Sequence, residues 1–345
     1  MNKYADIRGP ECLHPSLAET ADNLMGVTPL VQEMLKPGTP PEKIGARRQQ
    51  LHDMIAAVLL PAAPEHVAKV DKTEYFAPGL KEEAGAPKVR VVVTSPKKRS
   101  SDHLPVVFTI HGGGLCLGFP EMELNKQIRW AADLDCVCIA PSYRLSPENQ
   151  YPAAVNDLHS ALLWTVVNAK KLGIDPSRIV VEGISSGGHL AAALTHRLKD
   201  TGGPKLCAQL IQFPLLDDRQ ATPSSNIFFE QVWLPTAEQI SWRAWLGDQY
   251  ARADTPPDAV PGHARDFHGL PPAIIHGAEI DNGRDGVMSY ASGLMQAGVY
   301  CDLHIWGGAY HGFSIVQNDS ELARRYTNLV VMQLKDALTG KLPQK

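Results

Sequence analysis

Short apolar runs and amphipathic segments alternate along most of this 345-residue chain. Near-continuous apolar runs are typical of strands buried on both faces, and apolar residues recurring every three to four positions are typical of helices that cover a sheet. The pattern predicts strands at 67–76, 88–94, 104–110, 136–140, 178–181, 206–213, 273–276 and 300–305. It predicts helices at 123–134, 153–172, from 190 onward, 286–297 and 321–338. Strands that alternate with helices in this way predict an α/β fold with a mostly parallel sheet covered on both faces.

Two regions depart from this alternation. Residues 15–36 and 41–60 predict two amphipathic helices, which are either a packing pair or a cap over an active site. The sequence of this segment alone does not distinguish the two. Residues from about 219 to 269 are either an insertion that helps to build a cap and substrate pocket, or an extra helical layer with tryptophan in its core. They are rich in proline and in aromatic residues, namely Phe228, Phe229, Trp233, Trp242, Trp245 and Tyr250.

Composition narrows the classes of function. A net charge of −4 gives no reason to expect a nucleic acid or an acidic membrane surface as partner. No run approaches the ~18 apolar residues of a membrane-spanning helix, and the polar N-terminus lacks the apolar core of a secretory signal. The six scattered cysteines, without Cys-x-x-Cys or His-Glu-x-x-His, predict reduced thiols and no metal site. We therefore expect a cytoplasmic protein.

The segment Gly183-Ile184-Ser185-Ser186-Gly187 matches G-x-S-x-G, the pattern of a nucleophile elbow. The motif alone is a weak signal, because glycine and serine are common in turns. Here an apolar run precedes it and a helix-forming run follows it, which is the context that the chemistry requires. A sharp turn from strand to helix exposes the serine hydroxyl above the sheet, and the flanking glycines let the two backbones approach. Ser185 is therefore the candidate nucleophile.

A serine nucleophile needs a base, and the base needs a carboxylate on its other ring nitrogen. Of the thirteen histidines, His304 and His311 lie beyond the last candidate acid loop. His304 falls inside an alternating strand pattern, whereas His311 follows that strand in a glycine-rich turn from which it can reach Ser185. His311 is the candidate base.

The acid is expected where the strand predicted at 273–276 ends. Asp281 is best placed there, and Glu279 and Asp285 are competitors. Asp285 falls at the start of a predicted helix, where an acidic residue interacts favourably with the helix dipole and needs no catalytic role. Asp281 is the candidate acid.

The tetrahedral intermediate of such a reaction carries an oxyanion that needs preorganised donors. One donor is the N–H group of Ser186, directly after the nucleophile. Further donors are expected from the glycine run 112–114, where bare backbone can approach a substrate. A phosphate-binding loop is the weaker alternative, because the run lacks the lysine of G-x-x-x-x-G-K-[ST] and the spacing of G-x-G-x-x-G. The chemistry needs no cofactor.

With these motifs the chain resembles the hormone-sensitive-lipase-like carboxylesterases of the α/β-hydrolase superfamily. The resemblance implies an α/β-hydrolase fold with a helical cap, a triad of Ser185, Asp281 and His311, and oxyanion donors at Gly113, Gly114 and Ser186. The segments that carry it are His111-Gly112-Gly113-Gly114, Tyr143-Arg144-Leu145-Ser146-Pro147-Glu148, Tyr151-Pro152-Ala153-Ala154, Gly183-Ile184-Ser185-Ser186-Gly187-Gly188, Asp281 and His311-Gly312-Phe313.

The resemblance also implies a division of the chain. Residues 1–65 would form the N-terminal helical part of the cap, and residues 66–345 the catalytic domain, with a cap insertion at about 219–269. Three positions depart from the family pattern. Ser186 stands where alanine is usual, His189 stands where asparagine is common, and Asp281-Asn282-Gly283 replaces Asp-Pro-Leu.

We therefore expect a serine carboxylesterase that hydrolyses small to medium apolar esters through an acyl-enzyme. An amidase, lactonase or deacetylase with the same triad is an alternative, because these motifs do not read the leaving group. A non-catalytic ligand receptor on a hydrolase fold is a second alternative. Plant receptors that resemble this family have lost the base histidine, whereas this chain keeps His311 beside Ser185. The expected partner is a small-molecule ester, and some members of the family dimerise through the last strand and helix.

Overall fold

One sheet organises the computed structural model, which describes residues 12–18, 42–58, 61–227 and 235–343. Within these residues the strand order is β1-β2-β4-β3-β5-β6-β7-β8. β1 pairs antiparallel with β2, β2 pairs antiparallel with β4, and the other neighbouring pairs are parallel. The mostly parallel sheet is therefore confirmed. The strands are β1 (Val70–Ala77), β2 (Val89–Pro96), β3 (Leu104–Ile110), β4 (Val137–Pro141), β5 (Ile174–Ile184), β6 (Ala208–Gln212), β7 (Ala273–Ile280) and β8 (Cys301–Tyr310).

Burial explains which strand limits the sequence could predict. Every residue of β3 and β4 is buried, so both strands stand out as apolar runs. β5 begins at Ile174 rather than at 178, and β8 continues to Tyr310 rather than ending at 305. The additional residues of β5 pair with β3, and those of β8 pair with β7, through backbone groups. Residues among them such as Asp175 and Gly307 are not apolar, so the pattern of apolar positions did not predict these parts of the strands.

The helices mostly follow the predicted positions. The last helix has the predicted limits, whereas the helix predicted at 153–172 is interrupted at Asn168, whose side-chain amide donates to the Trp164 carbonyl over 2.8 Å. The helix expected from 190 onward begins directly after the candidate nucleophile. The helices are α1 (Pro15–Ala18), α3 (Glu42–Val58), α4 (Pro64–Val67), α5 (Leu124–Leu134), α6 (Ala153–Val167), α7 (Ala169–Leu172), α8 (Ser186–Thr201), α9 (Pro235–Leu246), α10 (Arg284–Gln296), α11 (Phe313–Val316) and α12 (Glu321–Leu338).

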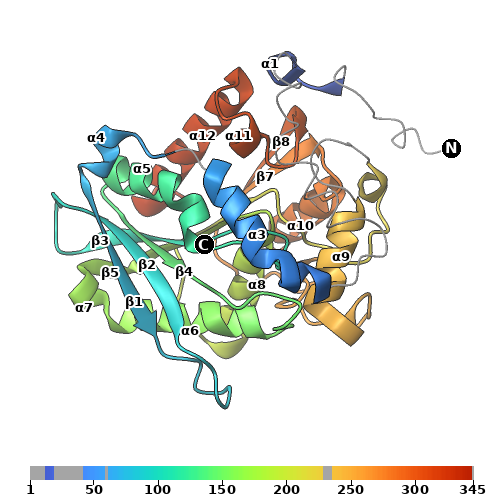
Figure 1. Cartoon of the computed structure of the whole chain (residues 1–345), viewed down its shortest axis with the longest axis horizontal. Helices are drawn as coiled ribbons and strands as arrows, with labels where there is room; N and C mark the ends of the chain where they lie inside the picture. The colour runs from blue at the N-terminus through green and yellow to red at the C-terminus, as the bar shows by residue number, and fades with distance from the viewer. Residues whose placement is uncertain (1–11, 19–41, 59–60, 228–234, 344–345) are drawn as a thin grey trace.

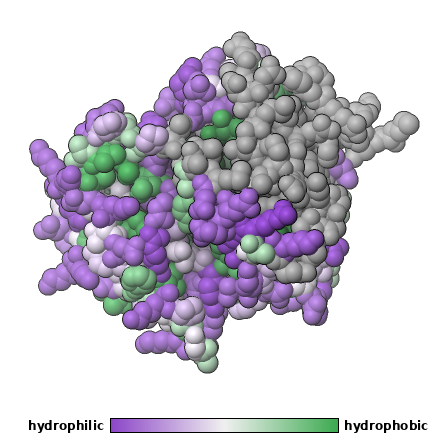
Figure 2. Space-filling model, viewed as in Figure 1, coloured by the Kyte–Doolittle hydropathy of each residue, from purple (hydrophilic) through white to green (hydrophobic). Residues whose placement is uncertain are grey.

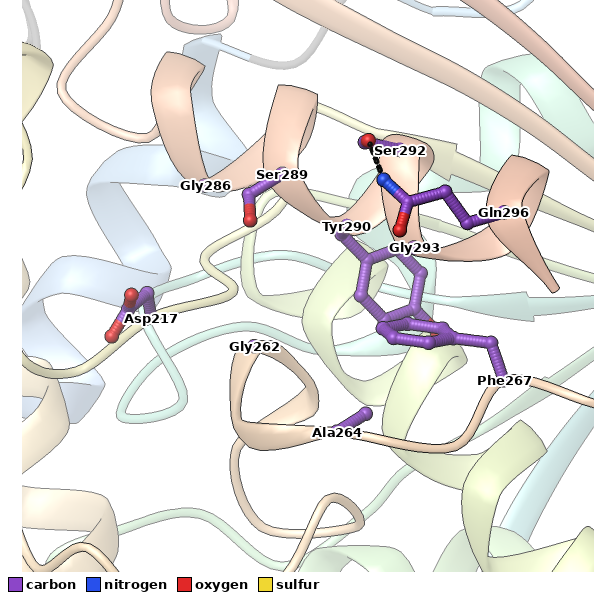
Figure 3. A pocket seen from close by; sticks show the side chains of 10 residues that line it. All are labelled: Asp217, Gly262, Ala264, Phe267, Gly286, Ser289, Tyr290, Ser292, Gly293 and Gln296. Atoms are coloured by element: carbon purple, nitrogen blue, oxygen red, sulfur yellow. Dashed lines mark hydrogen bonds between the residues drawn. The ribbon is translucent and has the colours of Figure 1, made fainter.

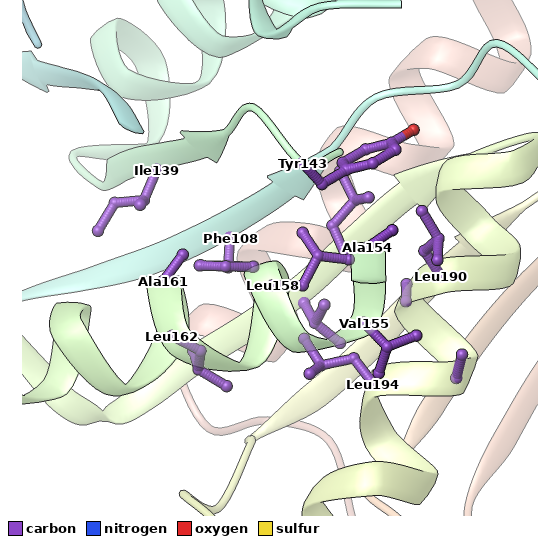
Figure 4. Close-up of a cluster of buried hydrophobic side chains, with 14 of the residues drawn as sticks. Phe108, Ile139, Tyr143, Ala154, Val155, Leu158, Ala161, Leu162, Leu190 and Leu194 are labelled. Carbon is purple, nitrogen blue, oxygen red and sulfur yellow. The ribbon is translucent and has the colours of Figure 1, made fainter. Parts of the chain in front are cut away.

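Helices cover both faces of the sheet (Figure 1). α5 and α12 pack on the face that carries Val107 and Val180, whereas α6 and α8 pack on the face that carries Phe108 and Val181. Figure 4 shows side chains of α6 and α8 gathered against Phe108 and Ile139. Because neighbouring strand residues point to opposite faces, each strand supplies both layers of the core.

The two regions that departed from the alternation contact each other in the fold. α3 confirms the second predicted N-terminal helix, and Ile44 and Leu51 on it pack against Ala237, Ile240 and Ala244 of α9. A helical layer was one of the two interpretations of this region, but the limits of α9 were not predicted. Of the helix predicted at 15–36, only α1 lies within the described residues, and the division of the chain at residue 65 stays a prediction.

The tryptophans of the second region lie in the core. Trp242 and Trp245 are fully buried with residues of α6 and α8, which is the extra-layer interpretation of the sequence. Phe228, Phe229 and Trp233 fall outside the described residues. Most of the side chains that carry a hydropathy colour in Figure 2 are hydrophilic, with a hydrophobic area over α4 and α5 at the left. Among the helices of the described ranges, none is long and apolar enough to cross a membrane.

The turn from β5 into α8 has no room for a side chain at Gly187, because a Cβ there would lie 2.0 Å from the Ile110 carbonyl oxygen. We expect Gly187→Ala to lower the free energy of unfolding by about 3 kcal/mol or more, since the neighbouring atoms are backbone and cannot move aside. Urea unfolding followed by circular dichroism measures the change.

The matched control is Gly286→Ala in the first turn of α10, where the nearest atoms to a new Cβ lie at 3.8 Å and 3.9 Å. Alanine there should leave stability unchanged or raise it by about 0.5–1 kcal/mol, because it lowers the entropy of the unfolded chain. Equal effects of the two substitutions would contradict the packing account.

Candidate active site

Ser185 occupies the corner between β5 and α8. Its φ of 58° and ψ of −126° lie in a region that side-chain-bearing residues rarely adopt. Such strain persists only where surrounding contacts hold it, and here the Ser185 N–H donates to the Gln212 carbonyl over 2.7 Å. The corner therefore places the Ser185 hydroxyl at the carboxyl end of the sheet, directly before the N-terminus of α8.

Three side chains from three loops form one hydrogen-bonded chain. Ser185 Oγ lies 2.9 Å from His311 Nε2, and His311 Nδ1 lies 2.8 Å from Asp281 Oδ2. Asp281 follows the end of β7 and His311 follows the end of β8, so parallel strands bring both to the edge of the sheet where β5 ends. The N–H of Gly283 donates to the other Asp281 oxygen over 3.1 Å and fixes the carboxylate. The three predicted residues thus lie together.

The electrostatics favour a proton on the ring of His311. Burial of the ring lowers its pKa, but the Asp281 carboxylate raises it by more, so that the pKa is above its ordinary value. Glu238 adds a smaller increase when its carboxyl is ionised. A base of raised pKa accepts a proton from a hydroxyl more readily. Asp281 is also positioned to stabilise the imidazolium that results.

The competing candidates have other contacts. Glu279 accepts the N–H of Gly308 over 2.7 Å at the bend of β8, and Asp285 accepts the N–H of Ser224 over 2.8 Å. His304 lies within β8, where its ring stacks on His276 at 5.2 Å and pairs with Asp302 at 2.9 Å. Each of these residues therefore has a structural role away from Ser185.

The glycine loop, residues 111–118, runs past the nucleophile. A Cβ on Gly112 would lie 3.3 Å from that of Ser185, and Gly113 and Gly114 have φ values of 125° and 60°. Within the described residues, the N–H groups of Gly113 and Gly114 donate to no protein acceptor. The N–H of Ser186 begins α8 and likewise has no acceptor within the helix. These predicted donors therefore remain available to a ligand.

Residues of the Tyr143–Glu148 motif support this loop. Tyr143 stacks on the ring of His111 with centroids 4.2 Å apart, and its hydroxyl donates to the His111 carbonyl over 2.8 Å. Arg144 binds Asp157 and Glu83, with nitrogen–oxygen distances of 2.8 Å and 2.6 Å. The motif therefore anchors the start of the glycine loop to the layer formed by α6.

The sequence did not predict a role near the triad for two buried polar residues, Glu238 and His189. Glu238 on α9 is 3% exposed, accepts the N–H of the Trp242 indole over 3.2 Å, and is close enough to Asp281 and His311 for their charges to interact. His189 is fully buried, and its Nδ1 lies 2.9 Å from the Leu215 carbonyl. Its ring meets Trp242 edge-on at 5.0 Å, so it joins α8 to α9 rather than lying on a helix surface. The i, i+4 spacing of Glu238 and Trp242 was the available signal.

One group in the described ranges has the composition of a metal site. Ligand atoms of Asp217, Asp218 and His263 lie within 4.8 Å of one another. Arg219 already binds both carboxylate oxygens of Asp217 at 2.7 Å, and His263 lies 2.8 Å from Asp218. The Arg219 guanidinium therefore already neutralises the Asp217 carboxylate, which is one of the three groups that a metal ion would need as ligands.

A pocket of about 300 Å³ adjoins this group. It lies between α10 and the segment that carries Gly262, Ala264 and Phe267, with Asp217 at one end (Figure 3). Its lining includes polar groups of Ser289, Ser292 and Gln296, but none of Ser185, His311 or Asp281. The pocket is therefore separate from the triad.

Comparisons with known proteins point to one family. Residues 107–315 match a protein family described by the alpha/beta hydrolase fold. Esterase LipI of Mycobacterium tuberculosis is 29% identical over 331 residues, which cover 94% of this chain and 100% of that protein. Carboxylesterase NlhH of the same species is 36% identical over 218 residues, covering 61% of this chain and 67% of that protein.

Solved structures agree. A structure described as a bacterial heroin esterase is similar over 95% of this chain and 98% of its own, with a TM-score of 0.84 and 32% sequence identity. The matched region of the family spans β3 to α11 and therefore includes Ser185, Asp281 and His311.

Glu238 generates a prediction about stability. Its burial, together with the nearby Asp281, raises its pKa to about 8, whereas in the unfolded chain it titrates near 4.5. The folded protein therefore binds this proton more tightly, and its stability falls as pH rises from about 4.5 to 8. Glu238→Gln removes that loss. We expect the stability of the variant relative to the wild type to increase by a few kcal/mol between pH 5 and pH 9, since one pKa unit corresponds to about 1.4 kcal/mol.

Chemical denaturation at the two pH values measures this difference. Glu82→Gln, the same change at an exposed carboxyl, is the control and should alter stability by less than about 0.5 kcal/mol at either pH. A difference between Glu238→Gln and the wild type that stays constant with pH would show that Glu238 keeps its charge in the folded protein.

Proposed function

The chain belongs to the α/β-hydrolase fold family as a hormone-sensitive-lipase-like carboxylic ester hydrolase, and from this we propose that it cleaves esters through an acyl-enzyme on Ser185. The observation that carries the proposal is the 2.9 Å contact between Ser185 Oγ and His311 Nε2. A serine hydroxyl is unreactive near neutral pH unless a base accepts its proton, and His311 is within reach to do so.

In the first step, Ser185 Oγ attacks the ester carbonyl carbon while His311 Nε2 accepts the hydroxyl proton. The resulting imidazolium is stabilised by the Asp281 carboxylate 2.8 Å from Nδ1. That hydrogen bond also fixes the tautomer in which Nε2 is free to accept a proton before attack. His311 then protonates the leaving alcohol as the carbon–oxygen bond breaks.

The negative charge that develops on the carbonyl oxygen is met by the N–H groups of Gly113, Gly114 and Ser186. Donors fixed in place before the reaction need no reorganisation when charge develops, and this is often the largest single contribution to catalysis. The N-terminus of α8 begins at Ser186, so the helix dipole adds a partial positive charge in the same place.

Water completes the cycle by the same chemistry in reverse. His311 accepts a proton from water, the hydroxide attacks the acyl carbon, and Ser185 leaves as its proton returns from His311. The products are a carboxylic acid and the regenerated enzyme. No step requires a metal ion or cofactor.

For the substrate, we propose a short acyl group on an uncharged ester. The similar solved structure is described as a bacterial heroin esterase, which supports an ester of a small molecule as the substrate. The fully buried positions of Trp242 and Trp245 also fit a compact site, since these side chains fill the core between α6, α8 and α9.

Location and assembly are also proposals. A cytoplasmic location is supported by the cysteines, because no disulfide joins any of the six, all of which lie in the described part of the chain. A homodimer through β8 and α12 fits the position of β8 as the last strand in the sheet order.

The proposed nucleophile predicts a large loss of activity in Ser185→Ala. We expect turnover of p-nitrophenyl acetate and butyrate to fall roughly a millionfold, because triad members act as a unit. The wild type should hydrolyse acetate and butyrate faster than palmitate, and a fluorophosphonate should add its mass to Ser185 alone. Residual hydrolysis in the variant within tenfold of the wild type would refute the assignment.

The acid can be tested against its nearest competitor. Asp281→Asn should lower kcat about 10⁴-fold, because the amide favours the wrong tautomer of His311. Glu279→Gln is the matched control, and kcat should stay within a few-fold of the wild type because the exposed Glu279 side chain accepts the N–H of Gly308 at the bend of β8. The reverse order of effects would move the acid to Glu279.

A further inference from the structure

One face of α3 lies against the glycine loop. Ile44, Arg48, Leu51 and His52 are spaced i, i+4, i+7 and i+8, which places them on one side of a helix. Ile44 and Leu51 pack with Cys116 of the loop and with α9. Figure 1 shows α3 crossing in front of the sheet beside α9. The two polar residues of this face therefore point in the direction of the loop.

Arg48 binds the backbone of the loop and of the segment behind it. Its Nε donates to the Cys116 carbonyl over 2.8 Å, and a terminal nitrogen donates to the Ser146 carbonyl over 2.7 Å. Glu148 holds the guanidinium in place through two contacts of 2.6 Å and 3.1 Å. Ser146 in turn donates its N–H to the Leu115 carbonyl over 3.0 Å. Arg48 thus fixes the middle of the loop by one direct and one indirect path.

His52 binds the end of the loop. Its Nε2 accepts the N–H of Gly118 over 3.0 Å, and its ring packs edge-on against Phe119 with centroids 5.1 Å apart. Accepting this bond requires an unprotonated Nε2. Burial of the ring and the nearby positive charge of Arg48 both lower the pKa of His52, and the weaker effect of Asp53 opposes them. The environment therefore keeps His52 in the form that can accept.

The contacts made by α3 complement those that the loop makes to itself. The Gly113 carbonyl accepts the N–H groups of Leu117 and Cys116 over 2.9 Å and 3.2 Å, so the loop is one tight coil. A displacement of Cys116 or Gly118 therefore moves the peptide units of Gly113 and Gly114 as well. The donors that face the nucleophile are connected to α3 through only a few backbone bonds.

We propose that Arg48 and His52 of α3 are positioning residues that hold the glycine loop in the shape in which Gly113 and Gly114 donate to the oxyanion. The inference rests on the proposed function, since it concerns the proposed oxyanion donors. It makes the N-terminal helix a structural part of the oxyanion site and not only a cover over it. A shift of the donors by a fraction of an ångström weakens their bonds to the transition state more than their contact with the substrate.

The test compares four variants. His52→Phe keeps the ring against Phe119 but offers no acceptor to Gly118, His52→Gln restores an acceptor, and Arg48→Met removes the guanidinium donors while keeping an apolar stem. Gln50→Ala, on the exposed side of α3, is the matched control. Activity on p-nitrophenyl acetate is divided by the concentration of active sites, which titration with a fluorophosphonate gives. Binding of an alkylboronic acid, which forms a tetrahedral adduct on the serine, reports on the oxyanion site directly.

We expect kcat to fall roughly 10-fold to 100-fold in His52→Phe and Arg48→Met, somewhat less than the loss of a whole oxyanion donor, with KM changed less than threefold. The inhibition constant of the boronic acid should rise by the same factor as kcat/KM falls. His52→Gln should recover most of the activity, and Gln50→Ala should match the wild type. Arg48→Met tests the proposal independently if His52→Phe does not fold.

Three results would overturn the proposal. They are kcat within twofold of the wild type in both His52→Phe and Arg48→Met, equal losses in His52→Phe and His52→Gln, or loss of kcat without weaker binding of the boronic acid. Failure of the proposed function gives a different pattern, in which the fluorophosphonate leaves activity intact in every variant and the wild type.

Discussion

The close approach of three backbone segments at Ser185 is the constraint on which the site depends. A Cβ on Gly183 would lie 2.2 Å from the Gly187 carbonyl oxygen, and one on Gly187 would lie 2.0 Å from that of Ile110. β5, α8 and the end of β3 therefore meet without side chains between them. Because β3 ends at this contact, the glycine loop that follows it begins beside the nucleophile. Packing of the sheet thus determines both where Ser185 lies and where donors to an oxyanion can lie.

A network of buried charged and polar side chains lies next to the turn at Ser185. Glu182, on β5, is fully buried and accepts bonds from Lys126 at 2.8 Å and from the side-chain amide of Gln212. The Tyr326 hydroxyl donates to the same Gln212 side chain, and the Gln212 carbonyl accepts the N–H of Ser185. Burial raises the pKa of Glu182 to about 7 even though Lys126 opposes it, so the pair is costly to bury. A network of this kind adds little stability, but it fixes the strand end that orients the serine backbone.

Features that depend on local sequence could be predicted, whereas features that depend on contacts between residues far apart in the sequence could not. Ser185, His311 and Asp281 were recognisable because each closely follows an apolar run, although β5, β7 and β8 continue past the predicted ends at 181, 276 and 305. β5 and β8 were predicted too short, because their added residues pair through backbone atoms that any side chain permits. The limits of α9 were not predicted, and neither were the contacts of Arg48 and His52 with the glycine loop. Arg48 and Cys116 lie 68 positions apart in the sequence, and His52 and Gly118 lie 66 positions apart. The local sequence around Arg48 and His52 therefore gives no indication of these contacts.

The buried histidines explain how the site keeps its charges few. Burial lowers the pKa of His111 and of His189 to about 4, so both rings stay neutral near pH 7 and act only as dipoles and packing surfaces. His311 differs because the Asp281 carboxylate lies against its ring and holds its pKa above the ordinary value. Of these three histidines, His311 is therefore the one whose surroundings favour the protonated ring, which is the imidazolium that forms during the reaction. In a water-poor site, fixed dipoles around a single developing ion pair stabilise it more strongly than additional mobile charges would.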